Sequence, residues 1–438
     1  MKKTILLIIA LFMTSASFAQ GMLNLFNRSD DFFKLMQDKK FNEAQASFDV
    51  SVQSKITSEA LEKLWTDLNE KLGKYESSDP IQSKVEGDLF VVTVEGKFAY
   101  TKQNFLLAFN KAEKLVGFLI QPRSNVQTYL NPAYADNTLY TEKEIYVKSG
   151  THTMVGMLTT PKNASNYPLV VLVHGAGPND MDATVGPNKP FKDLAAGLAS
   201  KGIASIRYVK RTTIYSGEFR GVFTVKEETV DDAVAAVALA RTIPGVDKKQ
   251  LYVLGHDLGG VLAPRIAALA PDLNGIILAE AGAQKFTDQL IDQNKYMFTM
   301  AKDTTQALKK EFDTMIKDLD QTRITALGTT IKADSVIFGL PASYWIDLNK
   351  YDQVETAKQL KQRILVIQGG NDFQTDEHNY EIWKKELGTK NNVTLKLYPD
   401  LNHLLTSQLE KSTSVQYQNA ASVSESLIID IVAWIKNK

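Results

Sequence analysis

The sequence predicts an α/β fold in which a mostly parallel, eight-stranded sheet follows a small α+β domain. Three observations support this prediction: short apolar runs alternate with helical segments after residue 140, a different pattern precedes residue 124, and a glycine-flanked turn directly follows one apolar run. The chain has 438 residues, 44% of them hydrophobic, so it can bury one large core and a smaller one. Its formal net charge of +0 gives no reason to expect a nucleic acid or an anionic membrane as partner.

The larger domain is expected over residues 140–438, where strand and helix patterns alternate. An antiparallel pair is predicted first, and buried strands rich in Val, Ile and Leu follow it. The predicted strands are 144–147, 154–159, 169–173, 203–207, 251–254, 275–278, 364–367 and 393–397. Helices are predicted at 191–200 and 229–241, and the polar, helix-forming insertion 284–350 is interpreted as a lid over the strand ends.

The smaller domain is expected over residues 22–124. Apolar residues at helical spacing predict helices at 30–48 and 61–72, and Val- and Phe-rich runs then predict strands at 88–100, 105–109 and 115–120. This order resembles nuclear-transport-factor-like and cystatin-like modules. Its aromatic residues are interpreted as core, and residues 125–139 as the linker to the larger domain.

The first residues have the pattern of a signal peptide. Lys2 and Lys3 precede the apolar run 5–13, which is too short to span a bilayer, and Ser17-Phe18-Ala19 offers a cleavage site before Gln20. We therefore expect residues 1–19 to be removed and the mature protein, without a membrane span, to be periplasmic or secreted. The chain contains no cysteine, which excludes disulfides, thiolate metal ligands and a cysteine nucleophile.

Residues 251–260 read Leu-Tyr-Val-Leu-Gly-His-Asp-Leu-Gly-Gly, an apolar strand followed by the glycine-flanked turn that is predicted to hold a catalytic residue. It is the nucleophile elbow of an α/β-hydrolase, Gly-x-Ser-x-Gly, with Asp257 where serine usually stands. A strand that turns abruptly into a helix strains its central residue, and Gly255 and Gly259 leave room for this turn. The helix that begins at Leu258 directs backbone N–H groups toward the reacting atoms.

Candidates for the other catalytic roles, the acid and the base, follow the elbow in the chain order that such a site requires. Asp372 follows the seventh predicted strand and is the predicted acid, and His403 follows the eighth and is the predicted base. The glycine-rich loop after the third strand and the start of the elbow helix supply the predicted oxyanion-hole donors, which are Ala176, Gly177 and Leu258.

Three other carboxylates compete for the role of the acid: Asp376, Asp400 and Glu280. Asp372 is favoured because the Gly369-Gly370 turn presents it at the end of its strand. Three metal ligands at a sensible spacing are not found, so no metal and no cofactor is expected.

Several separate loops together resemble EstD-type bacterial carboxylesterases, relatives of the serine aminopeptidase-like hydrolases. The matching stretches are 174–180, 186–191, Arg207-Tyr208 with Lys210-Arg211, 255–260, Gln368-Gly369 with Asp372, and Asn402-His403. The resemblance implies a periplasmic or secreted carboxylic-ester hydrolase that acts on small substrates. It places nucleophile, acid and base at Asp257, Asp372 and His403, and the departure from the family is the aspartate in place of serine.

An aspartate at the elbow leaves three hypotheses open. A carboxylate is a poor acyl acceptor, because it leaves the tetrahedral intermediate more readily than an alkoxide does, so Asp257 is expected to modify or weaken ester hydrolysis. It suits displacement at a saturated carbon, as in epoxide hydrolases and haloalkane dehalogenases, and Tyr344 and Trp345 of the lid are candidates to bind the leaving group. The third hypothesis is a catalytically silent protein that keeps the pocket for binding.

Overall fold

The structure, a computed structural model, describes residues 18–86, 89–121, 129–162, 164–301 and 305–437. The chain divides into two compact units, Met1–Val126 and Gln127–Lys438. None of the helices among the described residues combines the length and the apolar character that a bilayer span requires.

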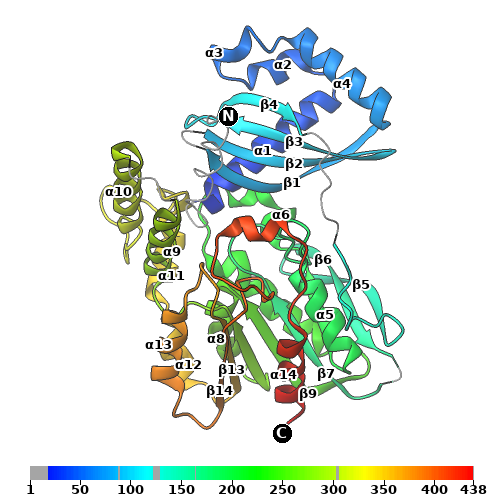
Figure 1. The fold of residues 1–438 in the computed structure, drawn as a ribbon, viewed down its shortest axis with the longest axis vertical. Coiled ribbons are helices and arrows are strands. Elements are labelled where there is room, and N and C mark those ends of the chain that lie inside the picture. Colours follow the sequence, from blue (N-terminus) through cyan, green and yellow to red (C-terminus); the bar gives the residue numbers. More distant parts are fainter. Residues whose placement is uncertain (1–17, 87–88, 122–128, 163, 302–304, 438) are drawn as a thin grey trace. The chain divides into compact units, whose positions relative to one another are not determined.

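The N-terminal unit packs helices against an antiparallel sheet with the strand order β1-β2-β3-β4 (Figure 1). Its elements are α1 (Phe18–Gln37), α2 (Phe41–Ala46), α3 (Val50–Gln53), α4 (Ser58–Leu72), β1 (Tyr75–Glu86), β2 (Leu89–Phe98), β3 (Thr101–Phe109) and β4 (Leu115–Ile120). Phe33 of α1, Trp65 of α4 and Phe105 of β3 meet in one aromatic core. The aromatic residues of this unit are therefore mostly core, as the sequence indicates, whereas strand β1 was not expected.

The second unit contains the predicted eight-stranded sheet, with the order β14-β13-β10-β9-β7-β8-β6-β5 among the described residues. Its strands are β5 (Tyr140–Ser149), β6 (His152–Pro161), β7 (Tyr167–Val173), β8 (Ala204–Tyr208), β9 (Val246–His256), β10 (Gly275–Ala279), β13 (Arg363–Gly369) and β14 (Val393–Tyr398). Strand β6 pairs antiparallel with β5 and β8, and all other neighbours are parallel. The prediction of a mostly parallel sheet is confirmed.

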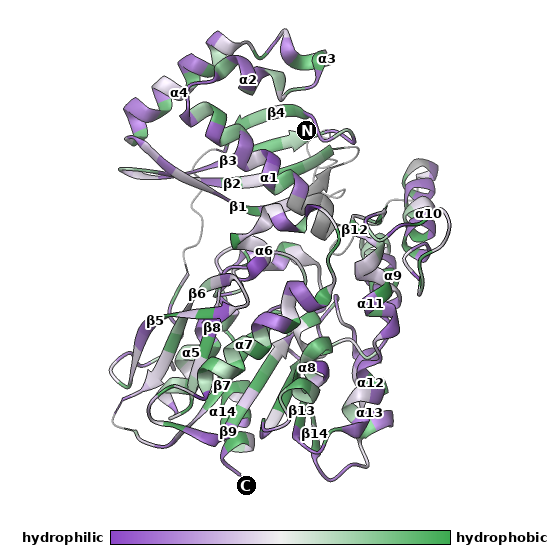
Figure 2. Cartoon of the chain, turned by 180° about the vertical axis from the view of Figure 1, so that it is seen from behind, coloured by the Kyte–Doolittle hydropathy of each residue, from purple (hydrophilic) through white to green (hydrophobic). Residues whose placement is uncertain are grey.

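Helices cover both faces of this sheet (Figures 1 and 2). Helices α5 and α14 pack on one face, where Phe191, Leu427 and Ile431 join strand residues such as Leu172 and Leu254 in the core. Helices α7 and α8 contact the strands from the other face. The bounds are α5 (Pro190–Ser200), α6 (Arg211–Ile214), η1 (Ser216–Arg220), η2 (Lys226–Val230), α7 (Asp231–Ala240), α8 (Leu258–Leu269), α13 (Glu377–Leu387), η3 (Ser414–Gln418) and α14 (Glu425–Lys436). The strands between them carry the most hydrophobic residues, because both of their faces are buried (Figure 2).

The insertion between β10 and β13 is helical, and its helices α9, α10 and α11 lie together beside the sheet (Figure 1). Its elements are α9 (Phe286–Met300), α10 (Gln306–Asp320), β11 (Val336–Ile337), β12 (Leu340–Pro341), α11 (Ala342–Lys350) and α12 (Gln353–Gln359). We keep the name lid for residues 284–350, which end with α11.

The described part of the expected linker, residues 129–139, is bound to the second unit. Tyr129 donates a hydrogen bond to Asp193 (2.8 Å), and Tyr134 donates one to the carbonyl oxygen of Val423 (2.7 Å). At the N-terminus, residues 1–17 of the expected signal peptide lie outside the described residues. Helix α1 begins at Phe18, so the expected cleavage site before Gln20 falls in its first turn.

Candidate active site

Asp257 occupies the tight turn between β9 and α8. Its backbone is in a strained, left-handed conformation, with φ 53° and ψ −122°. The flanking glycines are required, because a Cβ atom at Gly255 would lie 2.1 Å from the carbonyl oxygen of Gly259, and one at Gly259 would lie 2.3 Å from that of Val173. The turn therefore has the geometry of a nucleophile elbow, with an aspartate at its tip.

The predicted acid and base are in direct contact. Asp372 follows β13, His403 follows β14, and His403 Nδ1 lies 2.7 Å from Asp372 Oδ2. The other carboxylate oxygen, Oδ1, accepts the backbone N–H groups of Gln374 (2.7 Å) and Thr375 (3.0 Å). This arrangement holds the imidazole in one orientation and leaves Nε2 as the nitrogen that can accept a proton.

The charges around His403 favour its protonated form. Burial alone lowers the pKa of the imidazole, but the charge and hydrogen bond of Asp372, with a further contribution from Asp257, raise the pKa of His403 above its ordinary value. Burial raises the pKa of the Asp372 carboxyl, yet His403 and the surrounding hydrogen bonds lower it overall. An ionised Asp372 beside His403 can stabilise an imidazolium during a proton transfer.

The predicted oxyanion loop reaches the elbow through Ala176. Its N–H donates to Asp257 Oδ2 (3.2 Å), and a Cβ atom at Gly175 would lie 2.5 Å from the same oxygen, so glycine is needed there. Leu258 is the first residue of α8, where backbone N–H groups lack intrahelical partners. Ala176 therefore lies where an oxyanion donor is expected, and Leu258 stays a predicted donor.

Gly177 is a correction to the sequence hypothesis. Its N–H donates to Glu228 Oε1 (2.8 Å) and not toward Asp257. The side chain of Glu228, in the helical segment η2 before α7, is 2% exposed and holds the loop through this bond. Gly177 is therefore an anchor of the loop, and it is not the donor that was predicted.

Glu228 is the centre of a buried polar cluster that sequence reasoning missed. Lys210 Nζ lies 2.6 Å from Glu228 Oε1 and donates a second bond to the carbonyl oxygen of Gly175 (2.7 Å). From the lid, the Tyr344 hydroxyl donates to Glu228 Oε2 (2.6 Å). Burial, followed by the charge of Glu228, raises the pKa of Tyr344. The cluster holds the residues on both sides of Ala176 and joins them to the lid.

The structure also corrects the hypothesis that Tyr344 and Trp345 of the lid donate hydrogen bonds to a leaving group. Trp345 is fully buried, and its Nε1–H donates to the backbone carbonyl of Ile337 (2.7 Å). Because this indole N–H is already hydrogen-bonded to a carbonyl of the β11–β12 hairpin, it is not available to bind a halide. Tyr344, whose hydroxyl proton is bound by Glu228, is likewise occupied in this structure.

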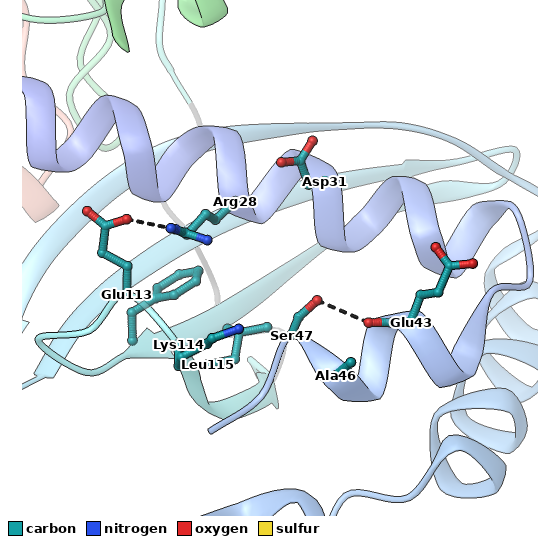
Figure 3. A pocket seen from close by; sticks show the side chains of 9 residues that line it. Arg28, Asp31, Glu43, Ala46, Ser47, Glu113, Lys114 and Leu115 are labelled. Atoms are coloured by element: carbon teal, nitrogen blue, oxygen red, sulfur yellow. Dashed lines mark hydrogen bonds and ion pairs between the residues drawn. The ribbon is translucent and has the colours of Figure 1, made fainter. Parts of the chain in front are cut away.

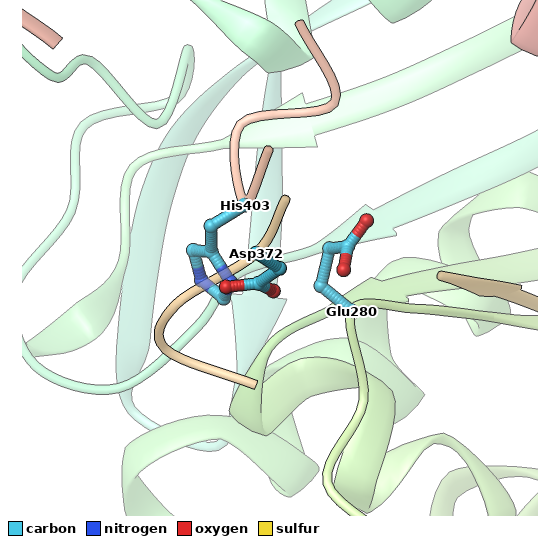
Figure 4. A group of neighbouring side chains, drawn as sticks. All are labelled: Glu280, Asp372 and His403. Carbon is cyan, nitrogen blue, oxygen red and sulfur yellow. The ribbon is translucent and has the colours of Figure 1, made fainter. Parts of the chain in front are cut away.

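Of the three rival acids, only Glu280 lies beside the acid–base pair (Figure 4). Asp376 and Asp400 belong to the surface loops after β13 and β14, and Asn379 donates to Asp376 (3.3 Å). One ligand atom each from Glu280, Asp372 and His403 lies within 4.8 Å of the others, a spacing at which a metal ion could be held. Hydrogen bonds already occupy these atoms: Gly369 N–H and the Gln368 amide donate to Glu280, and His403 binds Asp372. The donor set is thus built as a hydrogen-bond network.

The other four histidines have structural or surface positions. His256 is buried, with its Nε2 2.6 Å from the His403 carbonyl oxygen, and His174 packs against Phe191 and Tyr208. His152 pairs with Glu218 (2.7 Å), and His378 is exposed.

The N-terminal unit has a shallow hollow lined largely by charged side chains (Figure 3). Arg28 Nε lies 2.7 Å from Glu113 Oε2, so the charges at one end of the hollow neutralise each other. The remaining lining residues are Asp31, Glu43, Ala46, Ser47, Phe109, Lys114 and Leu115. They form no nucleophile–base pair, so the candidate active site is that of the second unit.

Comparison with known families agrees with this geometry. A family model described as serine aminopeptidase, S33, matches residues 165–410, which is more than half of the chain. The chain belongs to this family. A model described as a protein of unknown function (DUF3887) matches residues 29–118 of the N-terminal unit.

This S33-family chain is 31% identical to Esterase EstD of Thermotoga maritima over 404 residues, which are 92% of the chain and 93% of that protein. Among solved structures it is similar to Est1E from Butyrivibrio proteoclasticus with bound ferulic acid, with 14% identity and a TM-score of 0.44 over 67% of this chain and 100% of that one. A hyperthermophilic esterase from Pyrobaculum calidifontis gives 16% identity and a TM-score of 0.43 over 69% and 87%.

Proposed function

We propose that the chain hydrolyses small carboxylic esters at the site formed by Asp257, Asp372 and His403. The observation that carries this proposal is the contact of 2.7 Å between His403 and Asp372, placed at the strand ends beside the elbow. The likeness to Esterase EstD, which extends over 92% of the chain, supports esters as the substrate class.

In the proposed reaction His403 acts as a general base on a water molecule, because Asp257 is a poor acyl acceptor. The water oxygen adds to the ester carbonyl carbon while His403 Nε2 takes its proton, and the Ala176 N–H stabilises the oxyanion. Collapse of the intermediate breaks the bond to the alcohol oxygen, which receives the proton from His403. The products are a carboxylic acid and an alcohol.

This reaction is expected to be slow. Asp257 Oδ2 accepts the Ala176 N–H that an ester oxyanion would need, so the carboxylate competes with the transition state for this donor. Replacement of Asp257 by serine removes this competitor and restores the residue that the elbow motif usually carries.

Single turnover in heavy-oxygen water tests the proposed reaction directly. Label is expected in the carboxylic acid product, and the Asp257 carboxylate is expected to stay unlabelled. Label on Asp257 after one turnover would instead identify this carboxylate as the nucleophile.

A second candidate function is displacement at a saturated carbon, as in the opening of an epoxide. It is favoured by the contact between Ala176 N–H and Asp257 Oδ2, which fixes one carboxylate oxygen and leaves Oδ1 to attack. The occupied hydrogen-bond donors of Trp345 and Tyr344 count against it, because a leaving group needs such donors. Epoxides and alkyl halides, tested with the same isotope label, separate the two functions.

We also propose that the protein acts in the periplasm or outside the cell. The proposal rests on the two lysines, the short apolar run and the small residues before Gln20. Amino-terminal sequencing of the protein recovered from cell fractions tests it: a periplasmic or secreted form that begins at Gln20 is expected, and an uncleaved chain in the cytoplasmic fraction would contradict it.

A further inference from the structure

We propose that Glu280 is a positioning residue that keeps one proton between its own carboxyl group and that of Asp372, and thereby fixes the acid that orients His403. The inference rests on the proposed function only in treating His403 as the base. It gives the Glu280–Asp372 pair two carboxyl groups but a single negative charge.

The fold brings these two carboxyl groups together on adjacent parallel strands. Glu280 directly follows β10 and Asp372 lies shortly after β13, and the last paired residues of β10 and β13 are Ala279 and Ile367. Both carboxyl-bearing residues are 0% exposed. Glu280 also adopts a left-handed φ of 50°, which costs energy in a residue other than glycine. Figure 4 shows Glu280 beside Asp372, with His403 on the other side of Asp372.

The remaining hydrogen bonds show how each carboxyl group is held. Glu280 Oε1 accepts the Gly369 N–H (2.8 Å), and Oε2 accepts the Gln368 side-chain amide (2.6 Å). Asp372 accepts two backbone N–H groups on Oδ1 and has His403 on Oδ2. Asp372 thus has the stronger set of partners for a negative charge, including the imidazole.

One carboxylate oxygen of Glu280 lies within 4.8 Å of one of Asp372. Two buried carboxylates this close do not both ionise, because each would repel the other where water cannot screen them. The proton therefore stays on Glu280, whose O–H can donate to Asp372. In agreement, burial and then the charge and hydrogen bond of Asp372 raise the pKa of Glu280 well above its ordinary range. The other titratable groups that act on the cluster are His403, His256, Tyr417 and, through His403, Asp257.

A neutral Glu280 leaves the pKa of His403 lower than an ionised Glu280 would. It restrains Asp372 with a hydrogen bond, yet it adds no second negative charge beside His403. A second charge would raise the pKa of His403 further and would keep the imidazole protonated, which removes the free base at neutral pH.

Titration of His403 in nitrogen-15-labelled protein tests this state without any substrate. The wild type and Glu280→Gln are compared, since glutamine is neutral, has nearly the same shape and can donate to Asp372. The expected result is the same His403 pKa in both proteins. A clear fall of this pKa in Glu280→Gln would overturn the proposal, because it would mean that an ionised Glu280 had been removed.

Infrared spectra of the wild type alone give a second test, which does not depend on whether a variant folds. Carbon-13 labelling of glutamate is expected to shift a carbonyl band of a protonated, buried carboxylic acid at neutral pH, and labelling of aspartate is expected to leave this band in place. Absence of a band that shifts with glutamate labelling would contradict the proposal. Tight binding of added Zn²⁺ with loss of the band would contradict it also, by showing a metal site.

These readouts separate this inference from the proposed function. If the protein hydrolyses no ester but the band and the His403 titration behave as expected, the ester assignment fails and the role of Glu280 stands.

Discussion

Asp257 Oδ2 accepts a hydrogen bond of 3.2 Å from the backbone N–H of Ala176. The carboxylate at the elbow therefore occupies one donor of the predicted oxyanion hole, which a serine at this position would leave open for the substrate. A serine hydroxyl is one heavy atom shorter than a carboxylate and carries no charge at neutral pH. The same contact is the reason to expect slow ester hydrolysis, and it leaves Oδ1 of Asp257 for an attack on a saturated carbon in the second candidate function.

Removal of the Tyr344 hydroxyl is expected to loosen the oxyanion loop. Tyr344→Phe deletes the bond to Glu228, which anchors Gly177, so kcat should fall about tenfold with little change in KM, below the loss of about 10²-fold or more for a deleted oxyanion donor. Tyr252→Phe, which removes another buried tyrosine hydroxyl remote from this loop, is the control. Equal kinetic losses in both variants would show that the effect of Tyr344 is general destabilisation.

Trp345→Phe should lower stability without changing the reaction. The variant loses the hydrogen bond from Nε1 to the Ile337 carbonyl, which leaves a partly buried oxygen short of a partner and costs about 1 kcal/mol. Urea unfolding measures this loss. Selective loss of turnover on alkyl halides, with ester turnover kept, would show instead that the indole binds the leaving group.

The rate should rise with pH through the pKa of His403. The neutral imidazole is the base, and Asp372 holds this pKa above its ordinary value of about 6.5, so the half-maximal rate is expected above that pH. Asp372→Asn should lower kcat by about 10³–10⁴-fold, because the imidazole loses its orientation, and should move the half-maximal rate to lower pH. A pH profile of kcat/KM with its limb well below pH 6 in the wild type would contradict this assignment.

The two structural histidines should make the fold sensitive to acid. Burial, helped by the charge of Lys210, lowers the pKa of His174 to about 3, and burial with the charge of His403 lowers that of His256 to about 4. The unfolded chain binds protons on these residues below about pH 6.5 while the folded chain does not, so the free energy of unfolding falls as the pH decreases, by up to about 1.4 kcal/mol per pH unit and group.

Unfolding measured from pH 7.5 down to pH 4.5 checks this dependence. His174→Phe removes one of the two groups, and its pH dependence is therefore expected to be shallower than that of the wild type. Parallel curves for the two proteins would show that His174 does not contribute.

The strands of the large sheet could be predicted because their burial on both faces leaves a direct mark in the sequence. Runs such as 169–173 and 364–367 are uninterrupted and apolar, and their order fixes where Asp257, Asp372 and His403 emerge. Strand β1 could not be predicted, because it is an edge strand with the polar stretch Ser77-Ser78-Asp79-Pro80 and a register shift after Pro80.

The network around the site was less accessible from the sequence. Glu228 lies 51 residues from Gly177 and 116 from Tyr344, and no spacing marks these residues as partners. Trp345 could be placed in the lid, but the direction of its N–H depends on the β11–β12 hairpin, whose two-residue strands carry no clear pattern. Roles that follow from chain order were therefore predictable, whereas roles that depend on the direction of one hydrogen bond were not.

Ester hydrolysis at this site is tested most directly by the turnover of a panel of chromogenic short-chain esters by the wild type, Asp257→Ser and His403→Ala, measured side by side. The expected result is slow but measurable turnover by the wild type, turnover faster by about 10²-fold or more in Asp257→Ser, as expected when one oxyanion donor is freed, and none by His403→Ala. If neither the wild type nor Asp257→Ser exceeds the rate in buffer on any ester, the assignment of an ester hydrolase is contradicted.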